Sequence, residues 1–204
     1  MGFWDRHIVP CMIEVGMRQP DLMAYRARLV PRAAGRVLEI GVGSGHNLSF
    51  YGPAVERVTA LDLSPELLAK AEPRAAAAPV PVKLIEASAQ DIPLASASQD
   101  TVLLTWTLCS IAEPARALRE IRRVLKPGGA LLFVEHGLSP EPGVARWQHR
   151  VNPVWRRLAG GCNINRPTAS MVRDAGFALG DVAEGYANKF KIAAWMTEGS
   201  ARNA

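Results

Sequence analysis

The segment LEIGVGSGHN, residues 38–47, has three glycines spaced two apart, directly after an apolar run that contains an acidic residue. A glycine-rich turn after the first strand of an open α/β sheet binds a nucleotide, because its backbone N–H groups face the ligand and the missing side chains permit close approach. His46 stands where the dinucleotide fingerprint has its last glycine, and no Gly-Lys-Ser/Thr follows for a phosphate-binding loop. The segment therefore predicts a nucleotide-type ligand that neither of these motifs describes.

The sequence around this loop alternates between strand and helix patterns. Ser64 and Pro65 suit the N-cap and the first position of a helix, and Lys126-Pro-Gly-Gly ends another helix, at 115–126. Such alternation indicates an open α/β sheet with helices on both faces. The strands expected from apolar runs are Val37–Ile40, Arg57–Leu61, Val80–Ile85, Asp100–Trp106 and Ala130–Glu135.

The two ends of the chain add helices and a hairpin to this core. Helices are expected at Trp4–Met17, interrupted by Pro10, and at Asp21–Ala34, and a last helix at Thr168–Ala175. We therefore expect one α/β domain: a Rossmann-like, seven-stranded, mostly parallel sheet with a C-terminal antiparallel hairpin (178–186 and 189–197) and an N-terminal helical lid. Its parts are a cap (1–35), a cofactor-binding core (36–136), a substrate-side insert (137–167) and a C-terminal helix and hairpin (168–204).

Composition and charge limit the classes of protein that fit. The chain has 204 residues, 49% of them hydrophobic and 21% charged, as in soluble globular proteins. The net charge of +5 comes from the flanks: residues 1–36 hold 6 arginines and 3 acidic residues, and residues 137–204 hold 9 basic and 5 acidic ones. This charge favours anionic substrates, a membrane surface or simply solubility. Three cysteines without a CxxC motif predict neither a metal site nor a disulfide framework.

An acid flanks the glycine loop on each side. Glu39 precedes it, and Asp62 ends the second expected strand about 20 residues later. This pattern resembles class I S-adenosylmethionine-dependent methyltransferases, and the chemistry fits. The first acid suits the cationic methionine end of the cofactor, and the second can accept both ribose hydroxyls in charge-assisted hydrogen bonds. The resemblance implies S-adenosyl-L-methionine as cofactor and S-adenosyl-L-homocysteine as product. The cofactor-binding residues expected from it are Tyr25, Glu39, Gly41, Val42, Gly43, Gly45, Asn47, Asp62, Leu63, Ser88, Ala89, Gln90 and Thr105.

A more specific resemblance lies after the fifth strand. Glu135-His136-Gly137, Asn152-Pro-Val-Trp155, Gly161–Arg166 and Leu108-Cys-Ser110 are similar to the methyltransferase-like family of animal thiol S-methyltransferases. Bacterial relatives of that family are labelled phosphatidylethanolamine N-methyltransferases. The resemblance thus implies methyl transfer to a small or lipophilic acceptor. We expect a thiol, with phosphatidylethanolamine as the alternative, and a non-catalytic cofactor-binding or peripheral membrane module as the alternative of another class.

Candidate acceptor-side residues follow from the same segments. His136 is the expected base, since the unperturbed pKa of histidine is near neutral. It could equally hydrogen-bond the insert. The arginine-rich insert reads as an apolar lid or as an amphipathic covering helix that Pro153 interrupts or starts. The substrate-binding candidates are Trp106, Cys109, Trp147, Trp155, Asn163 and Arg166.

The expected partners are small molecules or lipids. Asn152-Pro153-Val154-Trp155 resembles the motif of DNA amino-methylating enzymes, but that motif belongs at the end of the fourth strand, where this chain has Thr105–Leu108. No basic run interleaved with aromatic residues is present either, so nucleic acid is not expected. The N-terminus lacks the pattern of a signal peptide. We expect a cytoplasmic protein with no obligate protein partner, and peripheral contact with the inner membrane surface as an open alternative.

Overall fold

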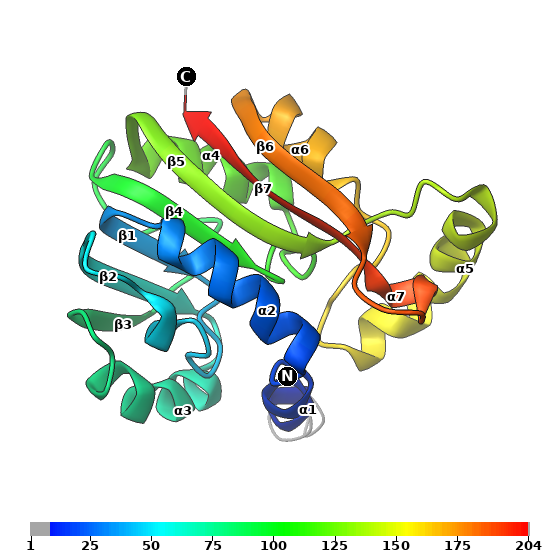
Figure 1. The fold of residues 1–204 in the computed structure, drawn as a ribbon, viewed down its shortest axis with the longest axis horizontal. Coiled ribbons are helices and arrows are strands. Elements are labelled where there is room, and N and C mark those ends of the chain that lie inside the picture. Colours follow the sequence, from blue (N-terminus) through cyan, green and yellow to red (C-terminus); the bar gives the residue numbers. More distant parts are fainter. Residues whose placement is uncertain (1–8, 204) are drawn as a thin grey trace.

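A computed structural model describes residues 9–203, which form one mixed sheet with helices on both faces (Figure 1). The strand order is β3-β2-β1-β4-β5-β7-β6. The first five strands pair in parallel, and β7 is antiparallel to both β5 and β6. The expected sheet with its C-terminal hairpin is thereby confirmed. The strands are β1 (Gly35–Ile40), β2 (Val55–Asp62), β3 (Val82–Glu86), β4 (Gln99–Thr105), β5 (Leu125–His136), β6 (Phe177–Tyr186) and β7 (Trp195–Asn203).

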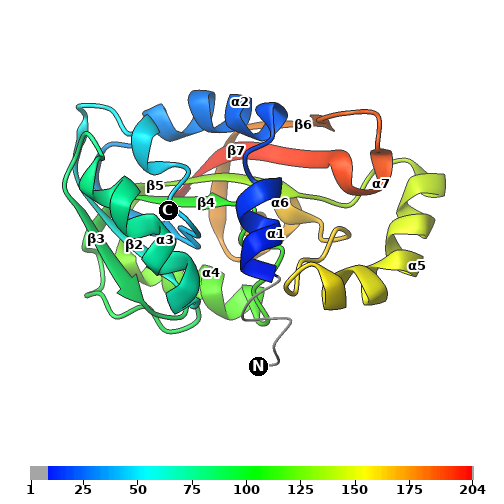
Figure 2. The same cartoon turned by 90° about the horizontal axis from the view of Figure 1, so that it is seen from below.

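Side-chain alternation along the central strands divides the core into two layers. In β1, Leu38 and Ile40 face a cluster that includes residues of α4 (Pro114–Val124) and α6 (Thr168–Asp174). Val37 faces the opposite cluster, with residues of α2 (Pro20–Leu29) and α3 (Pro65–Ala76). Successive strand residues point to opposite faces of the sheet. A sheet with helices packed on both faces therefore needs strands that are apolar at nearly every position. Figure 2 shows α2 and α4 on opposite sides of the sheet.

Several helices begin where the sequence predicts. The Ser64 hydroxyl accepts a hydrogen bond from Leu67 N (3.2 Å), which confirms the N-cap of α3. Of the two leading helices, α1 (Val9–Gly16) contains Pro10, and the part of the predicted helix before Val9, against which an interruption would be judged, is not described. Helix α2 passes into a 3₁₀ turn at Val30–Arg32. The predicted helix start at Trp4 lies outside the described residues.

Three predicted boundaries are wrong. The second strand of the hairpin begins at Trp195, not Lys189, because a one-turn helix, α7 (Lys191–Ala194), comes first. Helix α5 (Pro142–Leu158) runs through Pro153, which was expected to start or interrupt it. Lys126-Pro-Gly-Gly lies inside β5, since α4 already ends at Val124.

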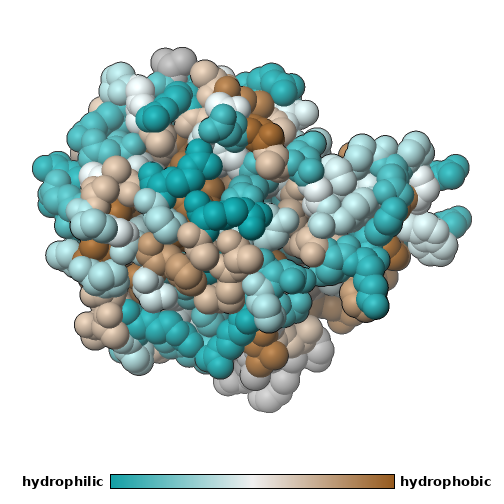
Figure 3. All heavy atoms as spheres, viewed as in Figure 1, coloured by the Kyte–Doolittle hydropathy of each residue, from teal (hydrophilic) through white to brown (hydrophobic). Residues whose placement is uncertain are grey.

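The strand order reverses between β1 and β4, and ligands of open α/β sheets bind at such a point, outside the carboxyl ends of the strands. Helix α5 lies away from the sheet on the side where β5 ends (Figure 1). Within residues 9–203, no helix combines the length and apolar character that crossing a membrane requires. Figure 3 shows polar and apolar side chains interspersed on the face it presents.

Candidate active site

The glycine loop follows β1 in a strained conformation that glycine permits. Gly41 has φ +70°, and a side chain there would collide with Thr107. Gly43 has φ +55° with no atom within 4 Å of the place a Cβ would take, so the loop backbone is open on this side. After the loop comes only a 3₁₀ turn (η3, Leu48–Phe50) instead of an α-helix. The loop therefore does not lead into the positive end of an α-helix dipole, which would favour an anion.

Glu39 is fully buried beneath this loop. Asn47 Nδ2 (2.8 Å) and the Tyr51 hydroxyl (2.7 Å) donate to its two oxygens, and Asn47 Nδ2 also donates to Thr105 Oγ1 (2.9 Å). Burial raises the pKa of Glu39 to about 7, although these hydrogen bonds favour the charged form. The Asn47 Oδ1 atom is buried and has no hydrogen-bond partner among residues 9–203. A carboxylate and an unpaired acceptor side by side suit a cationic donor such as an ammonium group.

Asp62 lies beside the loop at the end of β2. Its Oδ2 accepts from Gly43 N (2.8 Å) and its Oδ1 from Ser64 N (2.9 Å). Burial raises its pKa, and these backbone hydrogen bonds oppose that rise. Each carboxylate oxygen keeps a second lone-pair site, so both can still accept a hydroxyl. The neighbouring Leu63 side chain is 61% exposed and offers an apolar surface. Together with Glu39 and Asn47, these groups fit the expected S-adenosylmethionine.

The segment expected near adenine forms a tight turn. Ser88 pairs with Asp91 in an isolated bridge, and Ser88 Oγ accepts from Gln90 N (3.1 Å). Ala89 is buried in the core, whereas the Gln90 carboxamide oxygen accepts from Glu113 N (2.8 Å), directly before α4. The turn is thus anchored to the sheet and to α4, which fixes the position of its backbone.

Glu14 on α1 contacts the glycine loop, and the sequence analysis missed this residue. It lies 3.3 Å from His46 Nε2 and 2.9 Å from Arg74 Nη2, and Arg74 also donates to the carbonyl of Ser44 (2.6 Å). Burial alone would raise the pKa of Glu14, but hydrogen bonds from Ser44 and Arg74 lower it to about 2. Helix α1 is therefore pinned to the glycine loop. No sequence motif marks Glu14, because its partners come from distant segments.

Tyr25 and Trp106 lie on the α2 side of the sheet. Their rings meet edge to face at 6.1 Å, the Arg26 guanidinium lies 4.8 Å from the centre of the Trp106 ring, and Trp106 Nε1 is 3.3 Å from Met196 Sδ. Trp106 is 8% exposed and has φ +52°, unusual for a side chain of this size. The other two tryptophan candidates, Trp147 and Trp155, are on α5 and are 55% and 36% exposed.

Glu135, fully buried near the end of β5, holds the loop that follows β4. Its carboxylate accepts from the backbone N–H groups of Thr107 (2.8 Å), Leu108 (2.8 Å) and Cys109 (3.2 Å). Burial raises the pKa of Glu135 to about 7, and the backbone hydrogen bonds oppose the rise. The sequence analysis gave this residue no role of its own. An acid at the end of an apolar strand was the available signal.

Two of the candidate residues, Cys109 and His136, converge with Cys162 beside Glu135. Cys162 Sγ lies 3.5 Å from Cys109 Sγ and 3.8 Å from His136 Nδ1. Both cysteines are buried and free, whereas His136 is partly exposed. The Cys109 thiol lowers the pKa of Cys162, and His136 and Trp155 lower it further. In the same pair, the contact with Cys162 and burial raise the pKa of Cys109 well above its ordinary value.

The insert is tied to this cluster by buried amide side chains. Gln148 donates to the carbonyls of Gly137 (3.0 Å) and Ile164 (2.9 Å), and Asn152 donates to Asn163 Oδ1 (3.0 Å). Asn163 in turn donates to the Cys109 carbonyl (2.9 Å), and Arg166 donates to the Leu108 carbonyl. The contacts of Asn163 and Arg166 thus hold the loop after β4 in place.

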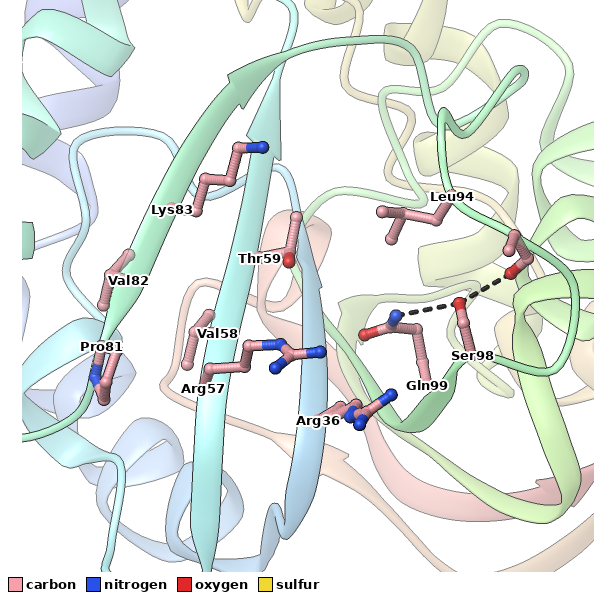
Figure 4. Close-up of a pocket in the computed structure, with 11 residues that line it drawn as sticks. Arg36, Arg57, Val58, Thr59, Pro81, Val82, Lys83, Leu94, Ser98 and Gln99 are labelled. Carbon is pink, nitrogen blue, oxygen red and sulfur yellow. Dashed lines mark hydrogen bonds between the residues drawn. The ribbon is translucent and has the colours of Figure 1, made fainter.

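A shallow cavity lies at the other end of the sheet (Figure 4). It has a volume of about 460 Å³ and is lined by basic residues from the amino-terminal halves of β1–β3, namely Arg36, Arg57 and Lys83, together with Ser98 and Gln99 at the start of β4. The amino ends of parallel strands are not where open α/β sheets bind their ligands. This cavity is therefore separate from the site described above.

Comparisons with known proteins match this geometry. A family model described as "Methyltransferase domain" matches residues 38–133. The human thiol S-methyltransferase TMT1B is 39% identical over 155 residues, which cover 72% of this chain and 62% of the relative. A Cereibacter sphaeroides phosphatidylethanolamine N-methyltransferase is 36% identical over 104 residues, covering 50% of this chain and 51% of the relative.

Solved structures agree on the fold. The N-methyltransferase NodS of Bradyrhizobium japonicum, solved in complex with S-adenosyl-L-homocysteine, superposes with a TM-score of 0.68 at 15% identity, over 91% of this chain and 89% of NodS. The chain spans about three fifths of the length of the thiol S-methyltransferases that it matches. The family match, the relatives and the sheet order agree, and the chain contains a methyltransferase domain of the S-adenosylmethionine-dependent type.

Proposed function

We propose that this protein methylates the sulfur of a small or lipophilic thiol. The observation that carries the proposal is the cluster of Cys109, which follows β4, His136 at the end of β5, and Cys162, which follows α5. Strands β4 and β5 run parallel to β1, so they end at the same edge of the sheet as the strand that the glycine loop follows. Thiol groups and an imidazole form an environment suited to a soft acceptor atom. The identity of 39% with a thiol S-methyltransferase supports the same acceptor class.

The cofactor supplies a methyl group activated by a sulfonium. We propose that Glu39 and Asn47 hold its ammonium group, that Asp62 accepts its ribose hydroxyls, and that Leu63 and residues 88–90 line its adenine. The chain's remaining task is to position the acceptor in line with the methyl group and to remove its proton. A thiol with a pKa of about 8.5 needs little help to ionise, and His136 Nδ1 lies 3.8 Å from Cys162 Sγ.

The test is S-adenosylhomocysteine release by the purified protein with hydrogen sulfide, alkyl thiols, small amines or phosphatidylethanolamine vesicles as acceptors. Turnover on thiols is expected, and His136→Ala should lower it. His149→Ala is the matched control, since His149 lies on α5 and contacts Asn165 (2.9 Å). Cofactor binding without turnover on any acceptor would point to a binding module instead.

Phospholipid N-methylation is the second candidate function. Its support is the 36% identity with a phosphatidylethanolamine N-methyltransferase and the surface of α5. On that helix, Trp147, Val154 and Leu158 are each more than half exposed, and arginines accompany them. Apolar and basic side chains together suit a peripheral contact with anionic lipid. Turnover on vesicles, with none on thiols, would establish this candidate over the first.

A further inference from the structure

The thiols and imidazole of the acceptor side form a group with the dimensions of a metal site. We propose that Cys109, His136 and Cys162 bind one zinc ion and that its fourth coordination position receives the sulfur of the acceptor thiol. The inference rests on the proposed thiol methylation, because that function identifies the fourth ligand. It changes the role of His136 from base to metal ligand.

The distances between the donor atoms support this reading. Tetrahedral zinc with Zn–S bonds of about 2.3 Å and Zn–N bonds of about 2.0–2.1 Å separates two sulfurs by about 3.8 Å and a sulfur from a nitrogen by about 3.6 Å. The two Sγ atoms are 3.5 Å apart, and Cys162 Sγ is 3.8 Å from His136 Nδ1. All three donor atoms lie within 4.8 Å of one another. A small inward movement of His136 would complete three corners of a tetrahedron.

The number of donors indicates an open position. Among the residues that the structure describes, no fourth histidine, cysteine or carboxylate joins the group. The nearest carboxylate, Glu135, already accepts three backbone hydrogen bonds. Structural zinc sites have four protein ligands, whereas catalytic ones have three and leave the fourth position to water or substrate. Two thiolates and one imidazole, with partial exposure at His136, match the catalytic pattern.

The surroundings hold these ligands in place. The Glu135 carboxylate accepts a hydrogen bond from the backbone N–H of Cys109. Asn163 donates to the Cys109 carbonyl, and Asn152 in turn donates to Asn163. The guanidinium of Arg166 interacts electrostatically with both thiols and donates to the carbonyl of Leu108, the residue before Cys109. Partners of this kind orient metal ligands in proteins, and losing one costs about 10–100-fold in metal affinity.

The proposed chemistry balances without an additional reagent. The acceptor R–SH binds the zinc as R–S⁻ and releases its proton to solvent. A sulfur lone pair then forms the bond to the methyl carbon as the bond from that carbon to the sulfonium breaks. The products are R–S–CH₃, S-adenosylhomocysteine and the proton already released. A neutral thioether binds zinc more weakly than a thiolate does, so the product can leave.

The first experiment measures metal binding directly. Chelator-stripped, reduced protein is titrated with Zn²⁺ against a chromophoric chelator and with Co²⁺ by absorption spectroscopy. One equivalent should bind, with a thiolate-to-Co²⁺ charge-transfer band. Loss of a residue that only supports a metal ligand weakens metal binding by about 10–100-fold. We expect a larger loss of Zn²⁺ affinity when a ligand itself is replaced, in Cys109→Ser, Cys162→Ser and His136→Ala. The control His149→Ala should bind Zn²⁺ as the wild type does. Absence of the band, or equal affinity in all variants, would overturn the site.

A second measurement covers variants that fail to fold. In the wild-type protein, Zn²⁺ should slow alkylation of Cys109 and Cys162 by iodoacetamide, as read by peptide mass spectrometry. Rates unchanged by Zn²⁺ would refute the site, as would the finding that the two cysteines only form a disulfide with each other and bind no zinc.

Turnover separates this inference from the proposed function. If thiol methylation continues unchanged after zinc removal, the zinc proposal fails and thiol methylation stands. If zinc binds but no thiol is methylated, the proposed function and the thiol at the fourth position fail together, and only the metal site remains.

Discussion

At the scale of single residues, Glu39 links cofactor binding to pH. Its pKa of about 7 means that the free protein holds this buried carboxyl partly protonated near neutrality. A cationic ligand favours the charged form, so binding releases a proton wherever Glu39 is protonated beforehand. We expect the affinity for S-adenosylmethionine to rise between pH 6 and pH 7.5, measured by isothermal titration calorimetry. This range lies below the pKa of a typical α-amino group, about 7.7–8.0.

The matched variant for this prediction is Glu39→Gln. An amide oxygen can still accept from Asn47 or Tyr51, but the group no longer titrates. The variant should bind the cofactor more weakly and with a flatter pH profile. If the wild-type and variant profiles have the same slope, a group other than Glu39 controls the pH dependence.

Glu135 gives the second prediction at this scale. Replacement by Ala would leave three backbone N–H groups without their acceptor, and an unsatisfied buried group costs about 1–3 kcal/mol. Glu135→Ala should therefore lower the free energy of unfolding by at least about 3 kcal/mol in urea denaturation. Glu135→Gln, which keeps one acceptor oxygen, should lose less. Equal losses in the two variants would contradict the assigned role.

At the scale of elements, α1 is held to the glycine loop by the charge of Glu14. Its partners Arg74 and His46 lie in α3 and in the loop. Glu14→Gln should loosen this contact, speed amide exchange in residues 11–16 and weaken cofactor binding several-fold. Glu72→Gln, a charge change elsewhere on α3, is the control for net charge. If amide exchange in residues 11–16 is equally fast in Glu14→Gln and in the wild type, Glu14 does not hold α1 to the glycine loop.

Some helices and strands could be predicted from the sequence, and others could not. Strands β1, β2 and β4 were found because apolar runs flanked by turn signals record local preferences. The one-turn helix α7 and the passage of α5 through Pro153 were missed, since tertiary contacts such as those of Gln148 decide them. The two acids of the cofactor side, Glu39 and Asp62, could also be predicted, from their spacing around the glycine loop. The meeting of Cys109 with Cys162, 53 residues apart, depends on how the insert folds back.

At the scale of the whole molecule, two buried carboxyls tie stability to pH. The pKa values of Glu39 and Glu135 are raised from 4.5 to about 7, and burial of the two carboxyls is the largest cause. A group with a raised folded-state pKa contributes stability that is complete below its unfolded pKa and is lost as pH rises through the folded value. Each group can contribute at most about 3 kcal/mol over the range from pH 4.5 to pH 7. The free protein should therefore be more stable at pH 6 than at pH 8.

Glu14 does not disturb this trend, because its pKa of about 2 restricts its effect to acidic solution, where stability falls as pH drops towards that value. Calorimetric melting of the cofactor-free protein from pH 6 to pH 8 should show a falling Tm. S-adenosylmethionine should reduce the fall, because its cation stabilises charged Glu39, and Glu39→Gln should reduce it without the cofactor. A Tm that does not change between pH 6 and pH 8 would mean that both carboxyls are ionised throughout this range, with water reaching them. The cofactor site would then be open to solvent at its base, and its affinity would no longer depend on the burial of Glu39.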